Sequence, residues 1–121
     1  MEIICVMLGG ALGSTARYLL GKRFAARYKS IPIGTFVINV SGAFLLGFVT
    51  GADISQLLYG LFAEGFLGAY TTFSTFMYED FVLLQNNRIL SAIIYISTTV
   101  VLGFIACYLG TSFAVFIIAP H

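Results

Sequence analysis

The stretch LLYGLFAEGFLGAYTTFSTFMY at residues 57–78 decides the fold, because TTFSTF at 71–76 does not suit an uninterrupted apolar helix. Four of these six residues carry hydroxyl groups. Gly68 lowers helix propensity, and the β-branched pair Thr71 and Thr72 lowers it a little further. The pattern therefore predicts a break in the helix. Backbone groups freed at membrane depth must face protein or water, and freed carbonyls are suited to coordinate a bare cation.

The composition is typical of a protein whose solvent is lipid. Of 121 residues, 60% are hydrophobic and 9% are charged, and the mean hydropathy is +1.00, whereas a soluble domain carries about a quarter charged residues. Apolar segments at about 3–20, 33–51, 57–84 and 89–118 are long enough to cross a bilayer. The sequence therefore predicts an all-α membrane protein, with a single transmembrane domain over residues 1–121 and four spans, the third broken near mid-membrane.

Glycines recur at a spacing that favours close helix packing. Gly9 and Gly13 are four residues apart, as are Gly47 and Gly51, and small residues at this spacing let helices approach closely in lipid. Arg17 continues the first pair at the same spacing. Because Arg17 lies near the end of the first segment, its charge either snorkels to the surface or makes a structural hydrogen bond.

Asn39 is a polar side chain in the middle of the second apolar segment. An amide at that depth must find hydrogen-bond partners, and a buried polar side chain in lipid is a candidate functional residue. Two interpretations stay open. Asn39 either joins helices as a structural hydrogen-bonding residue, or presents its NH₂ group as a neutral donor to an anion.

Phe73 and Phe76 fall on one helical face after the expected break. The edge of a phenyl ring carries partial positive charge, so two ring edges can contact a small anion without holding it as tightly as Lys or Arg. The alternative is that both rings only pack. On the fourth segment a mildly polar line repeats every four residues: Tyr95, Thr99, Gly103 and Cys107.

Three motifs together resemble the Fluc family of fluoride channels: GGALGSTARY at 9–18, GTFVINVSGAFLLGF at 34–48 and GFLGAYTTFSTF at 65–76. The resemblance covers the whole chain. It implies a passive fluoride exporter channel in the cell membrane and not an enzyme. It also implies an antiparallel dimer of dual topology, with two separate pores and a central structural sodium ion.

The resemblance also implies roles for individual residues. The fluoride pore falls on Asn39, Phe73 and Phe76, and Ser74 and Thr99 match its polar track more loosely.

The sodium ligands implied by the resemblance are the backbone carbonyls of Gly68 and Thr71. Arg17 and Glu79 match charged positions that the family usually carries, and Arg17 is taken as a structural charge.

The basic residues predict the orientation. If the four segments alternate, all six Lys and Arg residues lie on or close to the side of the first and third linkers, and none lies on the side of the termini. Basic residues favour the cytoplasm, so both termini are expected outside. A strongly biased chain rarely inserts in the opposite direction, which favours an antiparallel heterodimer with a related subunit of opposite bias; the alternative is a homodimer. The six residues are Arg17, Lys22, Arg23, Arg27, Lys29 and Arg88.

Other functional classes fit less well. The only histidine is His121, and Cys5 and Cys107 lie in apolar segments, so neither a zinc site nor a Ser-His-Asp hydrolase is indicated. A small proton-coupled drug exporter would need a carboxylate deep in the first segment. A non-conducting structural subunit is the other alternative. The carboxylates of the third segment lie toward its ends: Glu64, Glu79 and Asp80.

Overall fold

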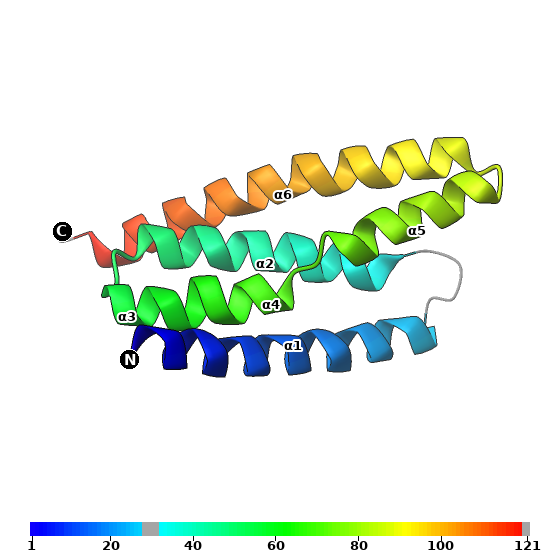
Figure 1. Ribbon diagram of the computed structural model, residues 1–121. Coiled ribbons are helices and arrows are strands. Elements are labelled where there is room, and N and C mark those ends of the chain that lie inside the picture. The colour runs from blue at the N-terminus through cyan, green and yellow to red at the C-terminus, as the bar shows by residue number, and fades with distance from the viewer. Residues whose placement is uncertain (28–31, 120–121) are drawn as a thin grey trace.

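The computed structural model describes residues 1–27 and 32–119 and contains only helices over these residues. Figure 1 shows elongated helices running side by side, with the N-terminus and the end of the last helix at the same end of the bundle. The elements are α1 (Glu2–Arg27), α2 (Ile33–Gly51), α3 (Gln56–Tyr59), the π-helix η1 (Gly60–Leu67), α4 (Gly68–Tyr70), α5 (Ser74–Gln85) and α6 (Ile89–Ile118).

Three of these helices, α1, α2 and α6, are long and apolar enough to cross a membrane. Their outer surfaces carry large apolar side chains, such as Leu12 and Phe104, which are mostly exposed. The fold is therefore all-helical and of the membrane type. The third predicted span, 57–84, corresponds to residues 56–85, which are divided among α3, η1, α4 and α5.

The predicted close packing at the glycine pairs is confirmed. A Cβ atom on Gly9 or Gly13 would collide with the backbone of η1, at Leu61 and Phe66 respectively. A Cβ atom on Gly47 would collide with the Cys107 carbonyl of α6. Backbone therefore meets backbone at both contacts, α1 against η1 and α2 against α6, which only small residues allow.

The third segment is interrupted where the sequence predicts a break. Thr71 leaves the helix with φ −75° and ψ 160°, an extended conformation, and α5 starts at Ser74. Before the break, η1 and α4 pack against α1; after it, α5 packs against α6 and α2. The break therefore carries the chain from one side of the bundle to the other (Figure 1).

A tight turn joins α5 to α6, as the residues QNNR at 85–88 indicate. Asn87 has φ 56°, in the left-handed region that Asn tolerates better than most residues. The Arg88 N–H donates to the Leu83 carbonyl at 2.9 Å. This turn holds α5 antiparallel to α6, against which α5 packs.

Candidate ion pathway

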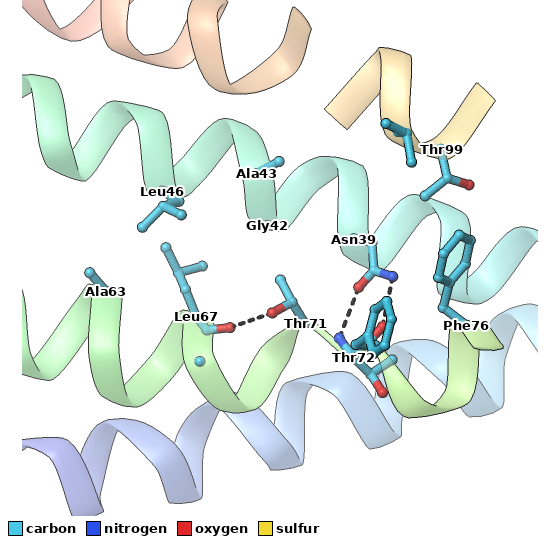
Figure 2. A pocket seen from close by; sticks show the side chains of 13 residues that line it. Asn39, Gly42, Ala43, Leu46, Ala63, Leu67, Thr71, Thr72, Phe76 and Thr99 are labelled. Atoms are coloured by element: carbon cyan, nitrogen blue, oxygen red, sulfur yellow. Dashed lines mark hydrogen bonds between the residues drawn. The ribbon is translucent and has the colours of Figure 1, made fainter. Parts of the chain in front are cut away.

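A groove of about 440 Å³ lies between α2 and the break of the third segment. Figure 2 shows Asn39 pointing from α2 toward the break, with Thr99 of α6 beyond Phe76. No lining residue is charged. The groove brings together six of the predicted site residues, namely Asn39, Gly68, Thr71, Phe73, Phe76 and Thr99, with Gly42, Ala43, Leu46, Ala63, Leu67, Thr72 and Val100.

Asn39 forms a reciprocal pair of hydrogen bonds with the backbone of Thr72. Its Nδ2 donates to the Thr72 carbonyl at 2.8 Å, and its Oδ1 accepts from the Thr72 N–H at 2.8 Å (Figure 2). The Thr72 N–H is thereby directed away from the Gly68 carbonyl, its partner in a regular α-helix. An amide carries two N–H donors, and no described residue takes the second. Asn39 therefore joins α2 to the break between α4 and α5 and also lines the groove.

Further side chains hold the break in place. Arg17 Nη1 donates to the Thr71 carbonyl at 3.3 Å, so this arginine makes a structural hydrogen bond and does not line the groove. Thr72 Oγ1 accepts from the Thr75 N–H at 3.3 Å, which caps the first turn of α5. The Thr71 carbonyl and both backbone groups of Thr72 thus have side-chain partners from α1 and α2.

The two phenylalanines differ in burial. Phe73 is 74% exposed and Phe76 is 7% exposed. Their ring centroids are 6.3 Å apart with an interplanar angle of 51°. Phe76 also meets the ring of Tyr95 edge-on, at 5.1 Å and 62°. Three aromatic rings are therefore continuous from the outer edge of the groove to α6.

Comparison with known proteins identifies the family. The family model described as "CrcB-like protein, Camphor Resistance (CrcB)" matches residues 4–111. A Clostridium acetobutylicum protein named Fluoride-specific ion channel FluC 2 is 48% identical over 111 residues, covering 91% of this chain and 95% of that protein.

The chain belongs to the CrcB/Fluc family. A Rhodococcus jostii protein named Fluoride-specific ion channel FluC 2 is 43% identical, covering 91% of this chain and 96% of its own. A Ligilactobacillus salivarius protein named Fluoride-specific ion channel FluC 1 is 41% identical, covering 90% and 96%. Membership confirms the resemblance seen in the sequence. It also confirms that the chain belongs to a family of multi-pass membrane channels and not of enzymes.

Two further residues of this CrcB/Fluc chain meet at Glu79 and were not expected there. Thr35 Oγ1 donates to Glu79 Oε1 at 2.7 Å, and the Tyr95 hydroxyl donates to Glu79 Oε2 at 2.9 Å. A line of polar side chains thus continues past Phe76 toward the end of the bundle where the turn joins α5 to α6. A sequence signal for it existed, since Thr35 precedes Asn39 by four residues and Tyr95 begins the polar line of the fourth segment.

The other predicted residues of the CrcB/Fluc motifs lie as follows. Ser74 is exposed at the start of α5 and does not line the groove. Thr99 lines the groove, but its hydroxyl donates to the Tyr95 carbonyl at 2.7 Å, as Ser and Thr in spans often do. The hydroxyl hydrogen of Thr99 is therefore already bonded within α6.

Proposed function

We propose that this chain is a fluoride-specific channel that exports fluoride passively across the cell membrane. The observation that carries the proposal is the groove, which combines Asn39, Phe73, Phe76 and Thr99 without any charged lining residue. The names of the relatives support the same ion. Passive flux needs neither ATP nor a proton gradient.

The chemistry of the lining suits a small, strongly hydrated anion. The second amide hydrogen of Asn39 and the edges of Phe73 and Phe76 offer partial positive charge only. Such groups replace water without trapping the ion, whereas conduction through a site with a fixed cation would be slowed by tight binding. Beyond Phe76, the carboxylate of Glu79 keeps the hydroxyls of Thr35 and Tyr95 oriented and limits how strongly an anion can bind there.

Fluoride efflux from liposomes containing the purified chain tests this function, with chloride as the control ion. We expect fluoride release and no comparable chloride release. Phe73→Ala is expected to reduce fluoride efflux at least tenfold. Phe104→Ala is the matched control, because Phe104 is also 74% exposed but lies on α6 outside the groove. Equal release of both ions, or equal effects of the two variants, would contradict the proposal.

We also propose that residues 56–85 form the fourth crossing and that two subunits pair antiparallel. At 1.5 Å per residue a helix of this length would span roughly 45 Å, more than the hydrocarbon core. The groove is open, and the break beside it exposes backbone and hydroxyl groups that lipid cannot satisfy. A second subunit over the groove would cover them and enclose a pore.

A structural sodium ion fits the break of such a dimer. The Gly68 carbonyl has lost the Thr72 N–H as its helical donor, and the Thr71 carbonyl keeps one lone pair beside its bond to Arg17. The Gly68 and Thr71 carbonyls of each subunit would bind the ion, and this shared ion would stabilise the contact between the two breaks. Arg17 places a positive charge at the same carbonyl, which weakens the attraction. Thermal stability of the purified protein in sodium and in N-methylglucamine tests the site; no difference would contradict it.

We propose that the natural partner is a related subunit of opposite charge bias, because the six basic residues all favour one orientation, with both termini outside. A homodimer is the alternative. Cysteines placed at Ser30 and Ser55, in a background without Cys5 and Cys107, would report orientation in intact cells. Ser30 and Lys29 lie outside the described residues. We expect only the cysteine that replaces Ser55 to be labelled from outside. Equal labelling of the cysteines at positions 30 and 55 would show dual insertion and support the homodimer.

A further inference from the structure

Asp80 is a buried acidic side chain without a hydrogen-bond partner. Its side chain on α5 is 2% exposed, and neither Oδ1 nor Oδ2 has a hydrogen-bond partner. It lies one turn after Phe76 and one turn before Leu83, on the face of α5 that forms a buried apolar cluster with Ala92 of α6. This is the one buried polar side chain of residues 1–27 and 32–119 that is left unsatisfied.

The helices packed against α5 supply no hydrogen-bond donor to Asp80. α2 contains no ionisable residue. On α6 the Tyr95 hydroxyl is directed to Glu79, and Arg88 at the start of α6 makes no hydrogen bond to either oxygen of Asp80. On α5 itself, Glu79 adds a second negative charge next to Asp80. Burying an ionised carboxylate in these surroundings would be strongly unfavourable.

We propose that Asp80 is a proton-binding site, whose side chain is the neutral carboxylic acid in the folded chain. One proton from solvent adds to one carboxylate oxygen, so α5 carries one negative charge instead of two. The remaining charge is Glu79, which already has two hydroxyl donors. The proposal for the proton itself does not depend on the ion that the chain conducts.

A consequence for conduction rests on the proposed function. Glu79 lies at the end of the polar line that leads from Phe76, and Asp80 follows it directly. Ionisation of Asp80 would place a second negative charge beside this path and repel an anion. At an effective dielectric constant of about 20, a like charge within one helical turn lowers anion occupancy roughly tenfold or more. Fluoride flux is therefore expected to fall at alkaline pH.

Thermal unfolding of the full-length protein from pH 5 to pH 9 tests the proton site. Unfolded Asp loses its proton near pH 4, so a folded state that keeps the proton loses stability as pH rises, by a factor of about ten in the folded-to-unfolded ratio per pH unit. Asp80→Asn has no carboxyl group at this position and therefore lacks this pH-dependent loss of stability. We expect the melting temperature of Asp80→Asn to exceed that of the wild type by a margin that grows with pH.

Asp53→Asn is the matched control, because Asp53 is exposed and its φ of 48° suits Asn equally well. A margin no larger than that of the control would overturn the proposal. So would a melting temperature of Asp80→Asn below wild type at neutral pH, since this would show that Asp80 is ionised and paired.

Two further measurements keep the test decisive. If Asp80→Asn does not fold, infrared spectra of the wild type and of Asp80→Glu at neutral pH replace it; a protonated-carboxyl band that shifts between them supports the site, and its absence overturns it. Fluoride efflux of the wild type is expected to fall about tenfold above the pH at which the margin in melting temperature stops growing, because Asp80 then ionises, and to stay flat in Asp80→Asn. If the wild type releases no fluoride at any pH, the proposed function fails, while unfolding still decides the proton site.

Discussion

Replacing Asn39 by Asp removes one of the two hydrogen bonds that join α2 to the Thr72 backbone in the break. The new carboxylate still accepts from the Thr72 N–H, which lies 2.8 Å from the original Oδ1. The Nδ2 donor becomes an oxygen, which would face the Thr72 carbonyl oxygen across the same 2.8 Å. Asn39→Ala removes both bonds, so the two variants separate one lost bond from two.

The expected loss of stability follows from these bonds. A net hydrogen bond contributes about 1 kcal/mol, and a buried group left without its partner costs about 1–3 kcal/mol. Asn39→Asp should therefore destabilise the folded chain by about 1–3 kcal/mol, and Asn39→Ala by about 2–6 kcal/mol. When the new carboxyl group of Asn39→Asp is protonated, it regains an O–H donor toward Thr72, so the deficit of this variant should shrink as pH falls.

Denaturation in detergent measures the stability, and fluoride efflux from liposomes measures the function. Asn86→Asp is the matched control, because Asn86 is exposed after the last turn of α5 and makes no contact with the groove. We expect both Asn39 variants to lose stability and at least tenfold in efflux, and the control to resemble the wild type.

Two outcomes would refute this reasoning. Wild-type stability in Asn39→Ala would show that the pair does not hold the break. Lost stability with normal efflux would show that the geometry of the break does not govern conduction. Lost efflux at unchanged stability would instead assign Asn39 to direct contact with the ion.

The remaining predictions concern packing and the polar line. Gly13→Ala should destabilise the chain by several kcal/mol, because its Cβ meets the Phe66 backbone, whereas Gly103→Ala, with nothing within 4 Å, should stabilise α6 by up to about 1 kcal/mol; equal melting temperatures would contradict this. Phe76→Ala should lose about 3–5 kcal/mol from its buried position, while Phe73→Ala should lose little; similar unfolding curves would show that their burial does not differ as described. Tyr95→Phe removes one donor from Glu79 and should cost about 1–3 kcal/mol, and unchanged stability and efflux would remove Tyr95 from the pathway.

The break and the glycine contacts could be predicted because their causes are local. Low helix propensity at Gly68, Thr71 and Thr72 acts on the residues that carry it, and the four-residue spacing of Gly9 and Gly13 defines a helix face without knowledge of its partner. The helical end of α1 was less predictable. It continues to Arg27, since basic side chains are good helix formers even where the apolar segment has ended.

The partners of polar side chains could not be predicted in the same way. The Asn39 pair joins residues 33 positions apart, and the Thr35–Glu79 bond joins residues 44 positions apart. Whether Asp80 is exposed or buried depends on the rotation of α5 about its own axis, and this rotation is set by packing against α6 and α2. The sequence suggested a carboxylate near the end of a span, while the structure encloses it.

The break also connects two tightly packed helix pairs, α1 with η1 and α2 with α6. Backbone-to-backbone contacts lock α1 to η1 and α2 to α6, and close-packed contacts of this kind do not deform gradually. The chain crosses from the first helix pair to the second at Thr71–Phe73, and the groove lies along the boundary between the two pairs. A bilayer that is thinner or under lateral tension exerts force on the whole subunit. We expect this boundary to deform first, so that membrane thickness or tension changes the width of the groove before it bends any helix.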